Sequence, residues 1–496
     1  MSTIDSTACV HAEKCGGCQY QGMSYDDTLK IKEEMVRDLF SPLFDLKEVY
    51  RGILPSPDIL GYRNKMEYSF GDEVKGGPLT LGLHKKKSFY DVITVDGCKI
   101  APQDFDEILK CTLEFFQKTG LKYYHKKKKE GYLRHLLLRR GRNTGMLLID
   151  LVTADFPEGE INEHELLMRY TDALLDLQKN GIVKDKIVGI LHTRNNSPAD
   201  AVIDEGTEIL YGEDSFSDSV LGITFHISPF SFFQTNTRGA EVLYSVVRKY
   251  VLAAKEQEKY SLLYDLYCGT GTITQVLSPV ADKVVGVEIV PEAVEKAKEN
   301  ALREGITNCE FICGDVLKAL DDMPEKPDMI VLDPPRAGVV PKALKKILSY
   351  GVKDIVYVSC KAVSLSQNLP AFFEAGYAVK DMTVVDMFPY TKNYETVCLL
   401  SKLHEAKHHV NVKVDMDELD LTSAEAKATY KEIEEWVKEH YGFHVTNLNI
   451  AQVKQKHGII ERENYNKPKS ENSRQPGTTP EKERAITEAL KFFKMI

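Results

Sequence analysis

The chain has 496 residues, too many for one ordinary hydrophobic core, so we expect two or three domains. Its composition, 43% hydrophobic and 28% charged, is that of a globular protein, and no stretch approaches the roughly 20 apolar residues of a membrane helix. The formal charge of −10 argues against a uniformly basic nucleic-acid binder, but binding depends on a local patch rather than on the total charge.

The first segment, 1–30, is rich in cysteine and glycine and lacks the basic start and apolar run of a signal peptide. We therefore expect a cytoplasmic protein whose 10 cysteines are reduced. Cys9, Cys15 and Cys18 form a short cluster, and Cys98 is a candidate fourth member. Such thiols can hold a zinc ion or an iron–sulfur cluster, and the spacing does not choose between them.

The second segment, 31–235, contains short runs that alternate apolar and polar residues, which predicts an α+β domain with a largely antiparallel sheet. The predicted strands are 65–70, 79–83, 133–138 and 146–152. Two basic stretches, 85–87 and 122–142, are candidates for contact with RNA phosphates and bases, and tyrosines are interleaved in the second stretch. Solvated lysine loops would give the same pattern.

The third segment, 236–402, alternates buried-strand runs with helical patterns, which predicts a doubly wound parallel sheet. The runs are 262–267, 283–290, 310–313, 329–332 and 355–359. The clearest helix spans 291–304 and starts with proline. Its predicted apolar face consists of Ala293, Val294, Ala297, Ala301 and Leu302.

The last segment, 403–496, predicts a small helical extension. A capping box at Thr422–Glu425 opens a helix that ends at Gly442, a second helix spans 448–456, and a third follows Pro480.

Residues with cofactor-binding chemistry follow the first three strands of the third segment. The glycines of Asp265-Leu-Tyr-Cys-Gly-Thr-Gly271 let a ligand approach the backbone at a helix start. Because the third glycine of the dinucleotide pattern is missing, an amino-acid nucleoside is favoured over a pyrophosphate cofactor. Glu288 ends the second strand, where it can accept from ribose hydroxyls, and Asp315 follows the third strand, where it can reach an adenine edge.

Two further motifs follow the fourth and fifth strands. Asp333-Pro-Pro-Arg336 forms an extended turn of a kind also found in enzymes that methylate base amino groups, so it does not identify the target atom. Cys360 ends the fifth strand at the same edge of the sheet. A cysteine in this position is either an inert core residue or a nucleophile.

Together these motifs resemble those of the RNA 5-methyluridine methyltransferases, specifically the iron–sulfur-containing RumA/RlmD branch that modifies 23S ribosomal RNA. The resemblance runs from about Cys9 to Lys402. Its motifs are Cys15-Gly-Gly-Cys18, Gly61-Tyr-Arg-Asn-Lys65, Ser231-Phe-Phe-Gln234, Asp265–Gly271, Asp333-Pro-Pro-Arg336, Val358-Ser-Cys360 and Phe388-Pro…Glu395.

The resemblance implies a class I (Rossmann-like) methyltransferase that acts on a uridine flipped out of RNA. Cys360 would be the nucleophile and Glu395 the general base. The implied contacts to S-adenosylmethionine are Gln234, Tyr267, Glu288, Asp315 and Asp333. The implied ligands of a 4Fe-4S cluster are Cys9, Cys15, Cys18 and Cys98. We expect a monomer whose partner is ribosomal RNA and which does not associate with a membrane.

The chain departs from the family pattern in three places. Many members carry an RNA-binding barrel before the cysteine motif, whereas only eight residues precede Cys9, so RNA binding is expected at the basic stretches. Tyr390 and Asn393 stand where members often have histidines. The segment 403–496 is additional, and we expect an accessory binding role for it.

Two other functions remain open at the level of sequence. A methyltransferase for base amino groups would explain the glycine loop and Asp333-Pro-Pro but would leave Cys360 and Glu395 without a role. A non-catalytic RNA-binding iron–sulfur protein would use only the cysteine cluster and the basic stretches.

Overall fold

The computed structural model describes residues 9–403, apart from 89, 127, 158–161, 199–201, 255–258 and 324, together with 430–457 and 478–493. Contacts divide the chain into two units, Met1–Glu405 and Ala406–Ile496. No helix among these residues is long and apolar enough to cross a membrane.

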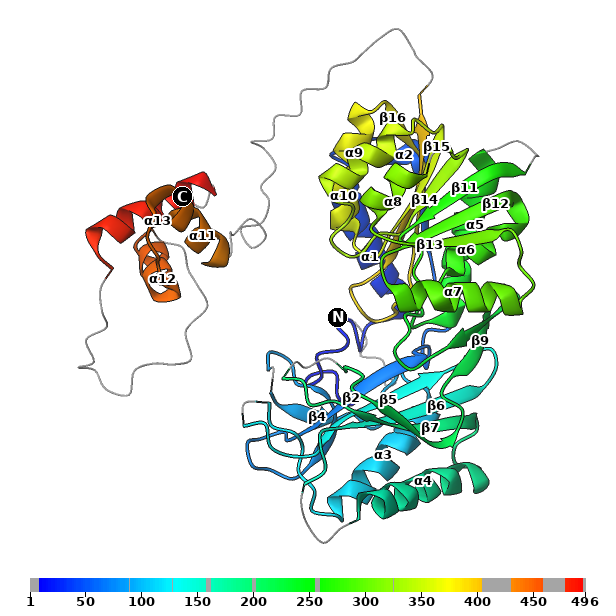
Figure 1. Cartoon of the computed structure of the whole chain (residues 1–496), viewed down its shortest axis with the longest axis vertical. Helices are drawn as coiled ribbons and strands as arrows, with labels where there is room; N and C mark the ends of the chain where they lie inside the picture. Colours follow the sequence, from blue (N-terminus) through cyan, green and yellow to red (C-terminus); the bar gives the residue numbers. More distant parts are fainter. Residues whose placement is uncertain are drawn as a thin grey trace. The chain divides into compact units, whose positions relative to one another are not determined.

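An eight-stranded sheet, in the order β1-β16-β17-β15-β14-β11-β12-β13, occupies the upper part of the first unit in Figure 1. All neighbours pair in parallel except β17, which is antiparallel to both β15 and β16. The strands are β1 (Tyr50–Leu54), β11 (Tyr260–Leu266), β12 (Ala281–Glu288), β13 (Cys309–Cys313), β14 (Met329–Leu332), β15 (Asp354–Ser359), β16 (Tyr377–Val385) and β17 (Glu395–Lys402). The predicted doubly wound sheet and its five strands are confirmed.

Helices cover both faces of this sheet, because its strands are apolar on both sides. One face carries α1 (Tyr25–Phe40), α2 (Leu46–Val49), α8 (Val316–Asp322), α9 (Pro341–Ser349) and α10 (Ala362–Glu374). The other carries α5 (Thr237–Ala254) and α6 (Thr272–Val276). The helix α7 (Pro291–Arg303) packs beside β13.

The apolar face predicted for α7 is wrong at one position. Val294, Ala297 and Ala301 are buried, but Leu302 is 82% exposed. A helix turns by about 100° per residue, so the position after Ala301 points away from the stripe. Asn300 is buried instead and accepts a hydrogen bond from the backbone of His226 (2.9 Å).

A seven-stranded sheet, in the order β4-β3-β2-β5-β6-β7-β8, forms the lower part of the same unit in Figure 1. Neighbouring strands are antiparallel, apart from β6 and β7, which pair in parallel. The predicted largely antiparallel sheet is therefore confirmed. The strands are β2 (Lys65–Gly71), β3 (Thr80–His84), β4 (Val92–Thr94), β5 (Leu133–Arg140), β6 (Met146–Thr153), β7 (Lys186–Arg194) and β8 (Thr207–Gly212). The helices α3 (Gln103–Gln117) and α4 (Glu163–Lys179) pack on it.

The two sheets are joined by the hairpin of β9 (Phe216–Val220) and β10 (Ile223–Ile227), whose apolar residues share a core with α5 and with Leu148 and Leu191 of the lower sheet. Residues 25–54 precede the lower sheet in sequence but belong to the upper part: β1 is a strand of the upper sheet, and α1 and α2 pack on that sheet. The division into segments at residues 30, 235 and 402 stays a prediction.

The second unit contains α11 (Tyr430–Tyr441), α12 (Asn447–Lys456) and α13 (Pro480–Phe492). Buried residues such as Ile433, Ile450 and Ile486 form its core. The second and third predicted helices are confirmed, and the first ends before Gly442 as predicted. Its predicted start at Thr422 lies outside the described residues.

Candidate active site

A cavity of about 1570 Å³ lies at the carboxyl ends of the parallel strands of the upper sheet and extends to β2 of the lower sheet. Ligands of doubly wound folds bind at this edge. All seven residues predicted to bind a cofactor or to react line the cavity: Gln234, Tyr267, Glu288, Asp315, Asp333, Cys360 and Glu395.

The glycine loop begins where β11 ends and turns sharply into α6. Tyr267 has a positive φ of 68°, and its N–H donates to the carbonyl of Val287 (2.9 Å). Gly271 has a φ of 72°, and a Cβ there would lie 2.5 Å from the Phe311 ring. Only glycine fits this position without a shift of the neighbouring core.

The carboxylate of Glu288 is fixed by backbone amides. Its Oε2 accepts from Gly269 (3.0 Å), and its Oε1 accepts from Ile289 (2.8 Å) and Val290 (3.0 Å). A carboxylate has about four acceptor positions, so it can still accept from ligand hydroxyls. Asp315 is exposed and caps α8 by accepting from Leu317 N (3.0 Å).

Asp333 lines the cavity and has Asp265 as a charged neighbour, which favours a cation at this part of the cavity. Asp265 is fully buried, accepts from Thr274 Oγ1 (2.6 Å), and has no hydrogen-bond partner at Oδ1 among the described residues. Burial raises its pKa to about 7. Burial and the charge of Asp265 raise the pKa of Asp333 to about 7 as well. A positive ligand would favour the charged form of both groups.

Cys360 and Glu395 are brought together by the antiparallel pairing of β15 and β17. Ser359 pairs with Thr396, so Cys360 and Glu395 are the next residues along the two strands. Glu395 is 2% exposed, whereas Cys360 is half-buried. Burial, followed by the charges of Glu395 and Asp333, raises the pKa of Cys360 to about 11.

Arg336 and Tyr244 also line the cavity, although the sequence analysis assigned no role to either residue. Arg336 is exposed, donates to Asn393 Oδ1 (3.5 Å), and lowers the pKa values of both Cys360 and Glu395. Burial is nonetheless dominant for Glu395 and raises its pKa well above the ordinary value. Tyr244 is buried on α5 and hydrogen-bonds the side chain of Gln234. Arg336 belongs to the Asp333-Pro-Pro-Arg336 motif, but nothing in the sequence marks Tyr244.

The four predicted cluster cysteines lie close enough to influence one another. Burial, with smaller contributions from the charges of Cys98, Cys15 and Cys9, raises the pKa of Cys18 to about 12. Backbone amides donate to two of the thiols: Gly17 to Cys15 (3.3 Å), and Ala101 and Ile100 to Cys98. Among the described residues, no three His, Cys, Asp or Glu side chains are gathered closely enough to hold a metal ion.

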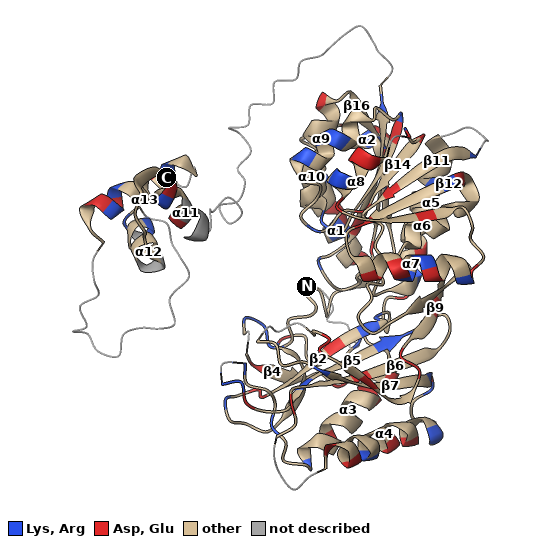
Figure 2. Cartoon of the chain, in the orientation of Figure 1, with Lys and Arg blue, Asp and Glu red and all other residues tan. Residues whose placement is uncertain are grey.

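The arginines of the basic stretch 122–142 do not form an exposed RNA surface, so this part of the prediction is wrong. Arg134 is 3% exposed and donates to the carbonyls of Asn195 and Ser197 (both 2.7 Å). Arg139 is 1% exposed and donates to three carbonyls of the 228–231 loop. Arg140 pairs with Asp185 and Arg142 with Asp58. Arg134, Arg139 and Arg140 lie on β5, and Figure 2 shows blue Lys and Arg positions on the strands of this lower sheet.

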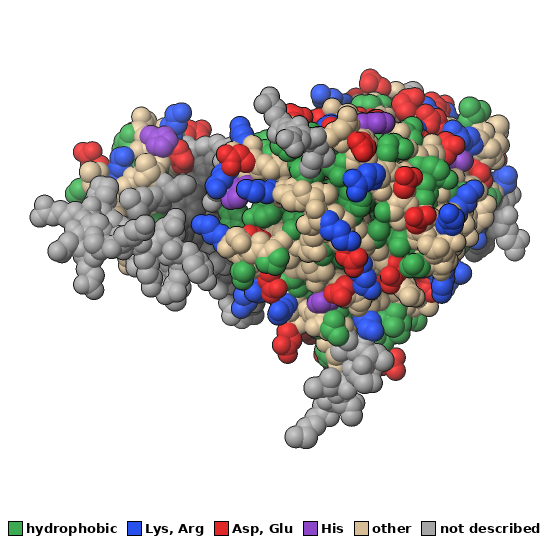
Figure 3. All heavy atoms as spheres, turned by 90° about the horizontal axis from the view of Figure 1, so that it is seen from below, with side chains coloured by type: hydrophobic (Ala, Val, Ile, Leu, Met, Phe, Trp, Pro, Cys, Tyr) green, Lys and Arg blue, Asp and Glu red, His purple; other side chains and the backbone are tan. Residues whose placement is uncertain are grey.

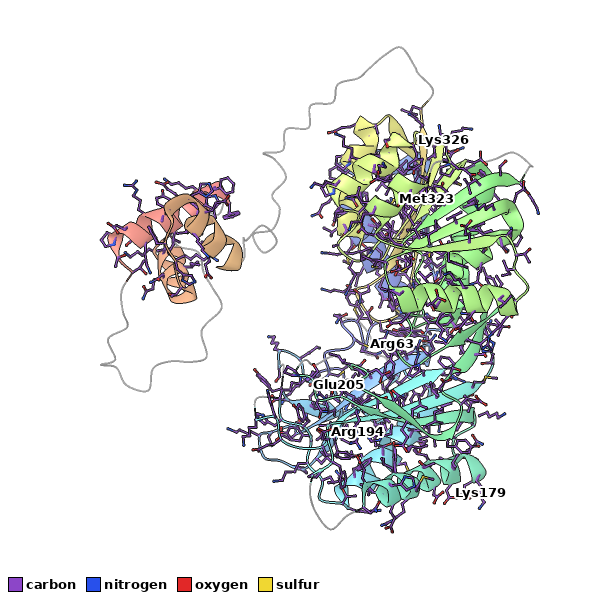
Figure 4. All side chains as sticks on the ribbon, in the orientation of Figure 1. Arg63, Lys179, Arg194, Glu205, Met323 and Lys326 are labelled. Atoms are coloured by element: carbon purple, nitrogen blue, oxygen red, sulfur yellow. The ribbon has the colours of Figure 1, made fainter. Side chains whose placement is uncertain are left out.

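Basic side chains at the cavity itself are better placed to contact an anionic ligand. Arg63, Lys65 and Arg336 line it, and Arg63 lies between the two sheets in Figure 4. On the face shown in Figure 3, by contrast, basic and acidic side chains are interspersed.

The chain is similar to several known proteins. The family model described as tRNA (Uracil-5-)-methyltransferase matches residues 221–403. An RNA methyltransferase of Caldanaerobacter subterraneus subsp. tengcongensis is 45% identical over 394 residues, 79% of this chain and 84% of that protein. An RNA methyltransferase of Clostridium tetani is 42% identical over 388 residues, 77% of this chain and 81% of that protein.

Among solved structures, the fold is similar to that of Pyrococcus abyssi tRNA (uracil-54, C5)-methyltransferase in complex with S-adenosyl-L-homocysteine. The TM-score is 0.61 at 24% identity, and the match covers 78% of this chain and 86% of that one.

Proposed function

Because the chain belongs to the RNA (uracil-5-)-methyltransferase family and is an S-adenosylmethionine-dependent enzyme, we propose that it methylates carbon 5 of a uridine in 23S ribosomal RNA through a covalent bond to Cys360. The observation that carries this proposal is the β15–β17 register, which brings Cys360 beside the buried carboxyl of Glu395 at the cofactor cavity.

The proposed chemistry explains why both residues are needed. The Cys360 thiol gives up its proton to solvent, the thiolate adds to carbon 6 of the uracil, and the electron pair of the 5,6 double bond moves to carbon 5. Carbon 5 takes the methyl group from the sulfonium of S-adenosylmethionine. The Glu395 carboxylate then removes the carbon 5 proton, the double bond re-forms, and the carbon–sulfur bond breaks to release the thiolate.

The cofactor is proposed to lie along the strand ends. Glu288 would accept from the ribose hydroxyls, Asp315 would contact the adenine, and Tyr267 would lie beside the nucleoside. Asp333 and Gln234 would hold the amino-acid end, where the raised pKa of Asp333 supports a cationic ligand. The RNA would enter over Arg63, Lys65 and Arg336, with its target base flipped into the cavity.

A test of the proposed substrate compares RNA from cells with and without the protein. Loss of 5-methyluridine at a 23S site is the expected result, measured by mass spectrometry of RNase fragments. Restoration by the wild-type gene but not by one encoding Cys360→Ala links the loss to this site. Loss from transfer RNA alone would contradict the ribosomal assignment, and loss of a base N-methyl group would contradict the proposed chemistry.

We also propose that Cys9, Cys15, Cys18 and Cys98 hold a 4Fe-4S cluster. Cys98, Cys15 and Cys9 each raise the pKa of Cys18, so the four thiols lie near one another. The amides that donate to Cys15 and Cys98 suit the negative sulfurs of such a centre. Methyl transfer itself requires no electron, so the cluster is proposed to have a structural role. It would connect the amino-terminal segment to the lower sheet.

Anaerobic purification is expected to give a brown protein with iron and acid-labile sulfide in nearly equal amounts, about four of each per chain. Cys18→Ala is expected to lose most of this iron because it removes one of four ligands. Cys111→Ala should retain it, since Cys111 lies on α3 outside the cluster. Stoichiometric zinc in place of iron, measured by plasma mass spectrometry, would contradict the assignment.

A further inference from the structure

One buried lysine, Lys32, donates hydrogen bonds to the turn that precedes Glu395. This turn, residues 386–394, connects β16 to β17. Lys32 of α1 is 0% exposed, and its ammonium donates to Asp386 Oδ1 (2.6 Å) and to the carbonyls of Phe388 (3.1 Å) and Asn393 (3.0 Å). One side chain therefore binds both ends of the turn.

The partner carboxylate is equally buried and has further contacts. Asp386 is 0% exposed and accepts from Tyr25 OH (2.9 Å) and from Phe388 N (3.2 Å). Tyr25 OH in turn accepts from Ser56 N (2.9 Å). The turn is thus fixed to α1 and to the loop after β1 by a network with no exposed charge.

Stability alone is a weak explanation for this pair. Burial of two charges costs several kcal/mol each, and apolar replacements of buried ion pairs are often neutral or stabilising. The three bonds of Lys32 do define the geometry of the turn. Phe388, Thr391 and Asn393 of the turn line the cavity, and Glu395 follows two residues after Asn393.

The outer side of the turn is fixed by the cysteine segment. The amides of Gln19 and Tyr20 donate to the carbonyl of Tyr390 (3.1 and 3.0 Å), and Lys392 N donates to Gln19 Oε1 (3.1 Å). Tyr390 has a positive φ of 62°, a conformation that non-glycine residues adopt only when their surroundings impose it. The turn therefore depends on contacts from outside itself.

We propose that Lys32 is a positioning residue for the reaction: through Asp386, Phe388 and Asn393 it holds the 386–394 turn so that the Glu395 carboxylate faces the carbon 5 proton. This inference rests on the proposed covalent mechanism. Its specific consequence is that loss of Lys32 slows proton removal and release of the thiolate more than it slows addition of Cys360.

The test uses full-length protein with Lys32→Met, which keeps the length of the side chain but removes the ammonium. We expect kcat to fall about tenfold to a hundredfold, the cost of a small misplacement of a catalytic group. The KM for S-adenosylmethionine should change by less than about threefold, because the turn is distinct from the glycine loop. An SDS-stable complex with ordinary uridine RNA should accumulate during turnover.

Lys30→Met is the matched control, since Lys30 lies on the same helix, is exposed, and pairs with Asp27 of that helix. It should behave as wild type. The double variant Lys32→Met/Asp386→Leu removes both buried charges, so it should unfold at a temperature close to that of wild type while kcat remains low.

Two results would overturn the inference, and they are distinguishable from failure of the mechanism. If Lys32→Met loses kcat only in proportion to its loss of folded protein, without accumulated complex, Lys32 is merely structural. If the double variant regains normal kcat, the charges do not position the base. If wild-type protein forms no Cys360-dependent complex with 5-fluorouridine RNA, the mechanism itself fails.

Discussion

Cys360→Ala is expected to abolish methyl transfer, with a loss of roughly 10⁴-fold or more, as for other enzymes that lose a covalent nucleophile. Carbon 5 of uracil does not attack a methylsulfonium unless electron density is first supplied from carbon 6. No other described cysteine among the cavity-lining residues stands opposite Glu395; Cys268, the second one there, belongs to the glycine loop.

The measurement is transfer of tritium-labelled methyl groups to RNA, together with a denaturing gel for the covalent complex with 5-fluorouridine RNA. Fluorine at carbon 5 cannot leave as a proton, so wild-type enzyme should remain attached to the RNA. Cys111→Ala is the matched control, because burial raises the pKa of that half-buried thiol to about 11 as well. Near-normal turnover by Cys360→Ala would exclude the covalent mechanism.

Glu395→Gln is expected to trap the enzyme on ordinary uridine RNA. The amide cannot take the carbon 5 proton, so turnover should fall about 10²- to 10⁴-fold, the usual contribution of a general base. The addition of Cys360 to carbon 6 does not need this proton acceptor, so it should still take place. The trapped species should therefore contain both the labelled methyl group and an RNA–protein bond.

A denaturing gel with labelled S-adenosylmethionine measures this species directly. Glu374→Gln is the control, since Glu374 is exposed at the end of α10. Rapid release of methylated RNA by Glu395→Gln would show that another group removes the proton.

The residues at the strand ends could be predicted from the sequence, because the rules for parallel sheets place these ends at one edge. Strand–helix alternation predicts a parallel sheet, and the carboxyl ends of parallel strands meet at one edge. Glu288, Asp315, Asp333 and Cys360 therefore had to lie near one another, and they all line the cavity. Glu395 is different. It begins an antiparallel strand, and its place beside Cys360 came from the family resemblance rather than from a pattern.

The burial of charged residues could not be predicted from the sequence. A lysine is almost always exposed, so a pattern gives no reason to place Lys32 in the interior. Its partner Asp386 lies 354 residues away, and only the tertiary fold brings them together. Arg134 and Arg139 were misjudged for the same reason. They stand in a basic stretch, but the carbonyls that surround them come from residues 195–197 and 228–231.

The raised pKa of Asp333 also bears on how the by-product would leave. Burial raises this pKa to about 7, so a cation that binds in the cavity beside Asp333 would drive the carboxyl toward its ionised form and release a proton. If the amino-acid end of the methyl donor lies there as proposed, its affinity would strengthen as pH rises through 7. The demethylated thioether has lost the sulfonium charge, so it would gain less from the same carboxylate than the methyl donor does.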